Sequence, residues 1–534
     1  MKNIINNIFA IAILLFSACT DLEEEPVGLL SPESFFQSPQ DVEAAIFGGY
    51  AILTSEATYG RDLAYGLLYG SDYIEFGNQG NAQRQAFQNY SLDPFNVLNT
   101  RIWQAFYAAI SASNAGINGA ELIDTDEETR NRLIAEARFI RAFSYYNLVR
   151  LYGAVPYIDF FVTDPVVVKE LDRLPVEEVY ANIIEDLAFA KENLPPLQNL
   201  KARATSGSAG TVLADVYLTR GQYDLAAQEA QNIVDSAGDF GYSLDADYQA
   251  LFDGSRQDGS PEPIFVVDFI SDFPLNAAGT AGAFSGAFSP NRTFFPNFTG
   301  VRGAAPPTPS SGGATRGFLS QLVMTIEGYN EWDIQDYRTR VAVTDTVYDN
   351  NGNLSAWETE GSTPVFIGDT ELSFPVPHME KYWKFPGWDW GTERPIDERL
   401  TEQNFNIYRY ADVLLIAAEA LIRSSGDQAL ATSYINQLRA RARNQNGIQS
   451  TIPEDLASVT VEDVLAERKL ELSFEFKRFF DIQRLVRNGH NSLDDFFGPG
   501  SSEPLETIPD ENRLFWPIPQ VEIDAAGLIQ NPGY

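Results

Sequence analysis

The chain has few of the residues on which most enzymes and metal sites depend. Its 534 residues include one cysteine, Cys19, and two histidines, His378 and His490. A lone cysteine cannot form a disulfide within the chain, and two histidines leave almost no material for a histidine zinc site or a Ser-His relay. Gly-x-Ser-x-Gly, Walker and dinucleotide-binding motifs are missing too. We therefore expect no catalytic residue, no metal site and no cofactor.

Positive charge is also scarce. Lys and Arg number 37 against 74 Asp and Glu, which gives a formal net charge of −37. Such acidity repels phosphate backbones, so nucleic acid is not an expected partner. Carboxylate pairs such as Asp333 with Asp336, or Glu371 with Glu380, could in principle serve a glycosidase. In so acidic a chain their proximity in sequence is expected by chance and indicates no catalytic pair.

The N-terminus indicates a lipoprotein signal peptide over residues 1–18. Lys2 precedes the apolar run Ile8–Phe16, and two small residues stand before Cys19. The run is shorter than the ~20 apolar residues that span a bilayer, and it is built as a secretory signal. Cys19 therefore resembles the acylated cysteine of a bacterial lipobox, although Phe16 stands where Leu is usual. No later stretch is apolar enough to be a transmembrane helix.

An acidic cluster, Asp21–Pro26, follows the lipidation site. It is consistent with a solvated tether, and it also resembles the acidic signals that export some Gram-negative lipoproteins to the outer face of the outer membrane. We expect a lipidated acidic tether over residues 19–30 and a cell-surface location, with the mature body anchored to the outer membrane.

The body from residue 31 onward is expected to be mainly helical. Ser31-Pro32 and Ser38-Pro39 are typical helix starts. Residues 136–150 form a long amphipathic pattern that stops at Gly153. We expect one body with an N-terminal helical part over residues 31–260, a loop- and hairpin-rich face over 261–400, and a C-terminal helical part over 401–534.

Two segments share a helix–turn–helix pattern. Gly221 and Gly426 each lie in an expected tight turn, followed five residues later by Ala226 and Ala431. Small residues where two helices cross are typical of tetratricopeptide-like repeats. Ordinary antiparallel helix pairs without repeat ancestry remain the alternative.

The middle of the chain changes character. Residues Phe273–Ile326 contain no Asp or Glu and are rich in Gly, Pro, Ser, Thr and Phe. Exposed phenylalanines are unfavourable in water, so this segment is expected to pack on the body or on a partner. Arg340–Thr346 alternates as a strand does, which predicts a hairpin over Val341–Trp357. A calcium loop at the same place is excluded, because an EF-hand frame would put Val347 at the first ligand position.

Aromatic residues beside planar polar groups favour sugar binding. Flat rings stack on the apolar faces of sugars, while Asn, Asp and Arg bind hydroxyl groups. Each ring taken alone could instead belong to a core, as we expect for Trp103 and Trp516. The candidate ligand-binding residues are Asp72, Tyr73, Phe76, Asn78, Arg84, Trp332, Trp388 and Trp390.

Opposite charges alternate along Glu467–Arg484 at spacings of three or four residues. This spacing pairs charges on one helix face. We interpret the block as a structural lattice of salt bridges rather than a catalytic site.

Several fragments in order along the chain resemble the SusD/RagB family of outer-membrane nutrient-binding lipoproteins. Each fragment is weak alone, but their shared order over some five hundred residues makes chance very improbable. The fragments include Gly49-Tyr50, Glu136–Ala142, Arg409–Leu415, Glu467–Leu472, Arg478–Arg484, Pro517–Pro519 and Asn531–Tyr534.

The resemblance implies a SusD-like fold, with tetratricopeptide-like helix pairs supporting a loop-rich ligand face with small β-hairpins. It also implies a non-enzymatic role: capture of oligosaccharide and delivery to a SusC-like TonB-dependent transporter. Because some members of the family bind peptides, a lipoprotein that takes up peptide or protein ligands remains the alternative.

Overall fold

The computed structural model describes residues 32–76, 82–252, 259–269, 322–344, 365–367, 370–372, 378–379, 404–445, 447–501, 504–505 and 508–534. These residues form mostly helices, with a few short antiparallel strand pairs. The fold is therefore mainly α, as the sequence predicts. The predicted division at residues 260 and 400 stays a prediction.

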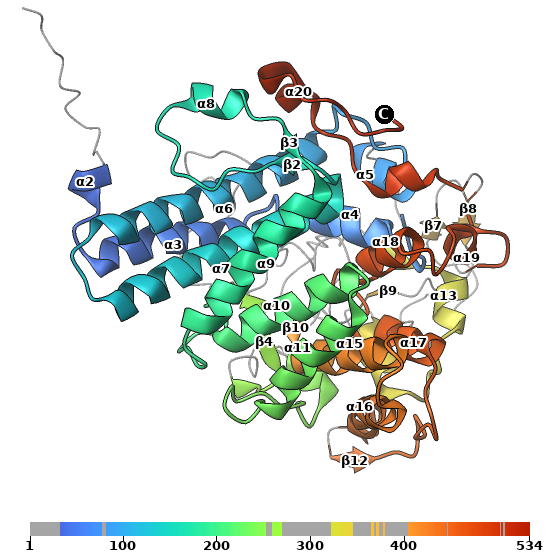
Figure 1. Cartoon of the computed structure of the whole chain (residues 1–534). Coiled ribbons are helices and arrows are strands. Elements are labelled where there is room, and N and C mark those ends of the chain that lie inside the picture. Colours follow the sequence, from blue (N-terminus) through green and yellow to red (C-terminus); the bar gives the residue numbers. More distant parts are fainter. Residues whose placement is uncertain are drawn as a thin grey trace, which may run out of the picture.

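Long helices pack side by side in the N-terminal half (Figure 1). α3 (Pro39–Leu53) lies on α6 (Val97–Leu122), α6 on α7 (Glu127–Tyr152), and α7 on α9 (Val176–Asn193). Ser38 stands at the N-cap of α3, as predicted. α7 ends at Gly153, whose φ of 73° is a left-handed conformation that glycine adopts without a steric penalty. Both predicted helix boundaries are confirmed.

Two helical hairpins continue the stack. α10 (Ser206–Thr219) and α11 (Tyr223–Asp235) form one, α15 (Tyr410–Arg423) and α16 (Gln428–Ala442) the other, and α11 packs on α15. Ala226 and Ala431 are fully buried, as expected where helices cross. Gly221 takes a positive φ of 68°, whereas in the second turn Ser425, at 58°, takes that conformation instead of Gly426. The hairpins are confirmed, but the turn glycines are not equivalent.

Shorter helices complete the described part of the chain. They are α2 (Pro32–Phe35), α4 (Asp62–Tyr69), α5 (Ala82–Gln88), α8 (Pro165–Lys169), α13 (Ile326–Asn330), α14 (Tyr337–Ala342), α17 (Val461–Glu471), α18 (Arg478–Arg487), α19 (Asp494–Phe497) and α20 (Gln520–Ala526), with 3₁₀ turns η1 (Tyr248–Phe252) and η4 (Glu511–Leu514).

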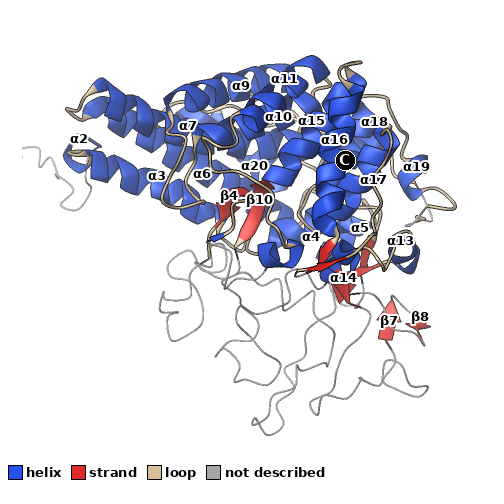
Figure 2. Cartoon of the chain, turned by 90° about the horizontal axis from the view of Figure 1, so that it is seen from below, coloured by secondary structure: helices blue, strands red, loops and turns tan. Residues whose placement is uncertain are grey.

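Four short strands from distant segments form one small sheet, in the order β1 (Ile74–Phe76), β5 (Leu322–Met324), β9 (His378–Met379) and β6 (Val343–Thr344). β4 (Pro263–Val267) pairs with β10 (Phe405–Arg409). The remaining pairs are β2 (Val155–Pro156) with β3 (Arg173–Leu174), β7 (Val365–Ile367) with β8 (Thr370–Leu372), and β11 (Asn444–Gln445) with β12 (Ile448–Gln449). Figure 2 shows β4, β10, β7 and β8 along one side of the helices.

The strand predicted from Arg340 is wrong at its start. Residues 337–342 form α14, because Asp336 caps the helix by accepting a hydrogen bond from the backbone N–H of Arg338. β6 then pairs with β9, some 35 residues further along the chain. The rest of the predicted hairpin, residues 345–357, lies outside the described residues.

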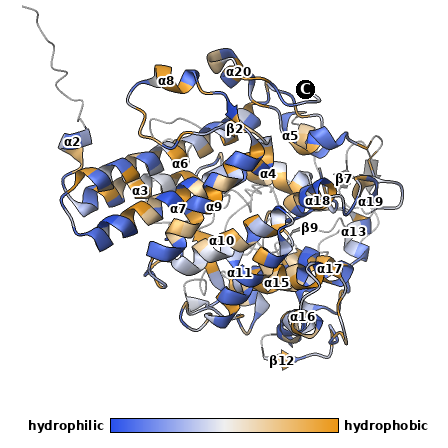
Figure 3. Cartoon of the chain, viewed as in Figure 1, coloured by the Kyte–Doolittle hydropathy of each residue, from blue (hydrophilic) through white to orange (hydrophobic). Residues whose placement is uncertain are grey.

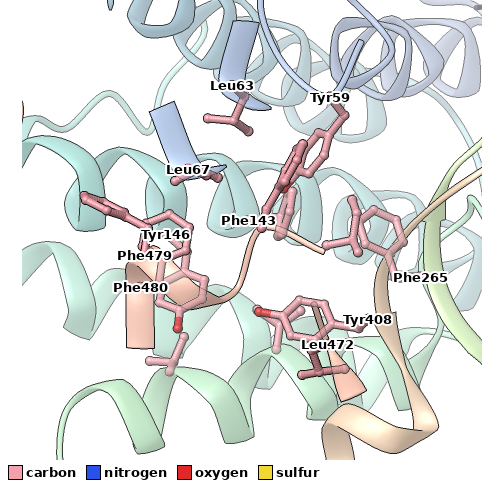
Figure 4. Close-up of a cluster of buried hydrophobic side chains, with 14 of the residues drawn as sticks. Tyr59, Leu63, Leu67, Phe143, Tyr146, Phe265, Tyr408, Leu472, Phe479 and Phe480 are labelled. Carbon is pink, nitrogen blue, oxygen red and sulfur yellow. The ribbon is translucent and has the colours of Figure 1, made fainter. Parts of the chain in front are cut away.

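One hydrophobic core joins the two helical halves. Tyr59, Phe143, Phe265, Tyr408 and Phe479 meet in it from segments spread over the chain (Figure 4). α3, α6 and α7 are banded in both colours of Figure 3, as amphipathic helices are. Trp103 and Trp516 are buried, and both contact the Tyr152 ring, at 4.8 and 5.9 Å between ring centres. The prediction that both are core residues is confirmed.

Candidate functional site

Two of the predicted ligand segments meet at one end of the β1–β5 pair. Tyr73 directly precedes β1, and Thr325 directly follows β5, which runs antiparallel to it. The backbone N–H of Thr325 donates to the carbonyl oxygen of Tyr73 at 3.0 Å. A few residues later Trp332 packs on the Tyr73 ring, at 5.7 Å between ring centres. The fold thus brings together side chains that lie some 250 residues apart in sequence.

Asp72 is buried in this region and is paired with two cations. Arg478 donates to both carboxylate oxygens, at 2.7 and 2.6 Å, and the Lys469 ammonium group lies 3.3 Å away. Burial by itself would raise the pKa of Asp72, but the charges of Arg478 and Lys469 outweigh it and hold the pKa well below its usual range. The carboxylate is therefore ionised and occupied by the protein's own side chains in this conformation.

Tyr73 is also buried, and its hydroxyl accepts a hydrogen bond from the backbone N–H of Phe474 at 3.0 Å. Burial raises the pKa of this phenol, so it stays neutral at physiological pH. Its ring lies against Trp332 and against Phe474, at 5.5 Å from the latter. Trp332 itself is only partly buried. Of these three predicted residues, Trp332 is the one that is not buried.

The other candidates lie apart or outside the described residues. Arg84, on α5, is partly buried with its guanidinium 4.6 Å from the centre of the Tyr65 ring. Phe76 ends β1, and only its backbone is described. Asn78, Trp388 and Trp390 lie outside the described residues, as does most of the acid-free segment, residues 273–321. Their predicted roles stay untested.

Three residues of this site, Glu331, Lys469 and Phe474, were not among the sequence candidates. Lys469, on α17, lies with its ammonium nitrogen 2.8 Å from a carboxylate oxygen of Glu331 and 5.7 Å from the centre of the Tyr73 ring. Glu331 stands directly before Trp332, but it carries no ring itself, and the charge spacing around Lys469 indicated partners on its own helix. We name the six residues Asp72, Tyr73, Glu331, Trp332, Lys469 and Phe474 the Trp332 cluster.

A network of buried ion pairs lies next to this cluster and includes the same helix. Glu471, at the end of α17, accepts hydrogen bonds from Arg338 at 3.0 Å, from Arg409 at 2.6 Å and from Arg441. We name the network the Glu471 hub; its members are Glu262, Asp336, Arg338, Arg409, Arg441, Glu467, Glu471 and Glu475.

The predicted salt-bridge lattice exists, but its geometry differs from the prediction. The block Glu467–Arg484 is broken between α17 and α18, where Phe474 and Phe476 take positive φ values of 62° and 61°. Arg468 still pairs with Asp481 across the break, at 2.9 Å. Glu471 and Arg478 instead pair with residues far away in sequence. Helical spacing alone could not show these partners.

The described residues contain no group of three or more His, Cys, Asp or Glu side chains arranged to hold a metal ion. Among the same residues, no helix has the length and apolar character needed to cross a membrane. A pocket of 370 Å³ between α11 and α15 is lined by polar side chains, including Asp224, Gln228, Gln231 and Asp235. It lies away from the Trp332 cluster.

Stacked helix pairs with small strand pairs along one side are the fold of SusD-like proteins. A solved laminarin binding SusD-like protein superposes with a TM-score of 0.74 over 93% of this chain and 100% of that chain, at 24% identity. Surface glycan-binding protein A from Bacteroides thetaiotaomicron, in complex with laminarihexaose, gives 0.72 over 92% of this chain and 99% of that chain, at 20% identity.

The sequence comparisons agree with the similarity to solved SusD-like structures. The SusD family model matches residues 278–534, and a model described as "Starch-binding associating with outer membrane" matches residues 31–218. SusD-like protein P2 of Formosa agariphila is 35% identical over 98% of this chain and 99% of its own length. Starch-binding protein SusD of Bacteroides thetaiotaomicron is 24% identical over 77% of this chain and 74% of its own length. The chain belongs to the SusD family.

Proposed function

We propose that this protein is a non-enzymatic glycan-binding lipoprotein of the cell surface, which captures oligosaccharide and delivers it to a SusC-like TonB-dependent transporter in the outer membrane. The observation that carries the proposal is the full-length relationship to SusD-like proteins, joined to family descriptions and relatives' names that refer to starch, laminarin and other glycans. The lipid on Cys19 would anchor the body to the membrane.

The Trp332 cluster supports this proposal. A sugar ring stacks on an aromatic face that is rigid and partly exposed, and Trp332 offers such a face backed by two other rings. Trp388 and Trp390, with Phe76, Asn78 and Arg84, complete the proposed ligand residues. The carboxylate of Asp72 and the hydroxyl of Tyr73 bond to the protein itself, so we assign these two residues to the support of the face.

A retention assay tests sugar binding. The purified chain is run in native gels that contain laminarin, starch or other polysaccharides, and it is compared with Trp332→Ala, Trp388→Ala and Trp390→Ala. Loss of one stacking ring should weaken retention about tenfold, as truncation of a central aromatic anchor does. Trp516→Phe, in the core, serves as the control. If no glycan retards the wild-type chain and an extracellular peptide library does, the peptide-uptake alternative is correct.

The anchor and the partner need separate tests. Mass spectrometry of the mature N-terminus should find a diacylated or triacylated Cys19, and Cys19→Ala should release the protein from the outer membrane. Affinity purification from the native host under mild detergent should recover an outer-membrane TonB-dependent transporter. Hydrolysis of the retained glycan by the pure protein would contradict the non-enzymatic assignment.

A further inference from the structure

Lys469 joins segments that are far apart in sequence. It projects from α17, and its ammonium nitrogen lies 2.8 Å from Glu331 and 3.3 Å from Asp72. Arg478 holds Asp72 from a second direction through two hydrogen bonds. The segment before β1 and the segment after α13 are therefore connected through one cation on the helical body.

The contact with Glu331 acts on the neighbouring residue, Trp332. α13, which leads into this segment, has only five residues, and a helix this short is not stable by itself. The backbone N–H of Trp332 donates to the carbonyl oxygen of Tyr329 at 3.1 Å, and its ring packs on Tyr73 and Phe474. Lys469 adds a fixed point directly beside the indole.

The same contact contributes little to folding stability. The Glu331 side chain is 48% exposed, and an ion pair this exposed stabilises the fold little, because water screens the charges. Lys469 itself is 10% exposed, so its ammonium group has few positions open to it apart from the one between the two carboxylates. The consequence of the ion pair is therefore mainly geometric.

We propose that Lys469 is a positioning residue for Trp332: by fixing Glu331 against Asp72, it sets the orientation of the indole ring that faces the ligand. The effect on binding rests on the proposed function, because it requires Trp332 to stack on a sugar. The effect on the orientation of the indole does not, and the two can be measured separately.

The orientation is measured by ¹⁹F NMR of the full chain, labelled with 5-fluorotryptophan and kept in detergent micelles. Trp332→Phe identifies the Trp332 resonance. Lys469→Met removes the charge but keeps the length of the side chain, and it should shift and broaden that resonance while Trp103 and Trp516 keep theirs. Lys469→Arg should restore a single sharp signal. An unchanged Trp332 signal in Lys469→Met would overturn the proposal.

A matched control is available on the helix stack. Lys191 pairs with Glu229 at 2.6 Å, with a side chain 36% exposed and a partner 10% exposed. Lys191→Met should leave the Trp332 resonance in place. In Lys469→Met, Asp72 keeps its two hydrogen bonds from Arg478 and stays paired, so both Met variants should melt close to the wild type. A large loss of melting temperature in Lys469→Met alone would show that the residue is structural, which contradicts a positioning role.

The link to binding is measured with laminarin as the probe in the native-gel assay. Lys469→Met should weaken retention about fivefold in the wild-type background and have no further effect in Trp332→Phe, because it acts through that ring. Equal losses in both backgrounds would contradict the proposal. If laminarin does not retard the wild-type chain, that result counts against the proposed ligand, while the ¹⁹F result still decides whether Lys469 orients Trp332.

Discussion

The helix stack and the Glu471 hub are both buried, yet different interactions hold them together. In the stack, α6, α7 and α9 bury apolar side chains against the helices that adjoin them, and the buried pair Arg141–Asp186 links α7 to α9, the next long helix along the chain. In the hub, Arg409 and Glu471 join strands and helices from distant segments. The comparison teaches that neighbouring helices need only matched faces, whereas a buried charge needs particular partners.

The strongest test of this difference is Glu471→Gln, which keeps the shape of the side chain and removes its charge. Arg338, Arg409 and Arg441 would each lose one buried counter-charge, although each still pairs with another carboxylate of the hub. Removing one partner of such a pair lowers the free energy of unfolding by about 3–5 kcal/mol. Urea denaturation followed by far-UV circular dichroism measures the loss. A loss below about 1 kcal/mol would show that the hub is not the critical element.

Glu419, next to the hub, should make stability depend on acid. Burial alone would raise its pKa, but Arg484 at 2.7 Å and Arg423 at 2.8 Å lower it to about 2. Because the pKa is depressed in the folded state, the stabilisation is present above the ordinary glutamate pKa and is lost as the pH falls from about 4.5 toward 2.

The contribution of Glu419 is at most about 3 kcal/mol, since each pKa unit corresponds to about 1.4 kcal/mol. Denaturation curves at pH 6 and pH 3 measure it. Glu419→Gln should be less stable than the wild type at pH 6 and closer to it at pH 3. A gap that is the same at both pH values would refute the assignment.

In the helix stack, a conservative substitution of a buried residue should lower stability less than Glu471→Gln does in the hub. Ile183, on α9, is fully buried, and Ile183→Val removes one methylene group without disturbing any charge. Such changes lower the free energy of unfolding by about 0.5–1.5 kcal/mol. The same urea denaturation measures it, and the loss should be smaller than that of Glu471→Gln. A larger loss for Ile183→Val than for Glu471→Gln would contradict the difference between the stack and the hub.

The smallest effect is expected where an ion pair lies at the surface. Glu177 pairs with Arg220 between α9 and the end of α10, with a side chain 73% exposed. Glu177→Gln should change the free energy of unfolding by less than about 1 kcal/mol. It is the matched control for Glu471→Gln, because the same chemical change is made at a solvated site. Equal losses at the two sites would show that burial is not the cause.

Sequence reasoning succeeded where the pattern is local. The start of α3 at Ser38 and the end of α7 at Gly153 follow from capping residues and from glycine's freedom at positive φ. The pairing of α10 with α11 follows from small residues around a short turn. Each of these depends on atoms within a few residues of one another, so the sequence contains all the information needed.

Sequence reasoning failed where contacts with distant residues override the local pattern. Arg340–Thr346 alternates as a strand does, but Asp336 and the ion pairs of Arg338 favour a helix over the first part. The charge spacing of Glu467–Arg484 predicted pairs along one helix, but Glu471, Glu475 and Arg478 pair with residues outside the block. In the candidate site, Asp72, Tyr73 and Trp332 were selected for their chemistry, but nothing in the sequence indicated that Lys469 joins them.

The sequence by itself determined the mainly helical class, the helix pairs and the family, because these depend on periodicity, on capping residues and on fragments in a fixed order. The tertiary structure alone decided which charges are buried together, that Asp72 and Tyr73 bond to the protein, and that Trp332 keeps exposed surface beside Lys469. The physical reason is that an ion pair or a ring contact acts only over a few ångströms, and the folded chain brings residues hundreds of positions apart to that distance.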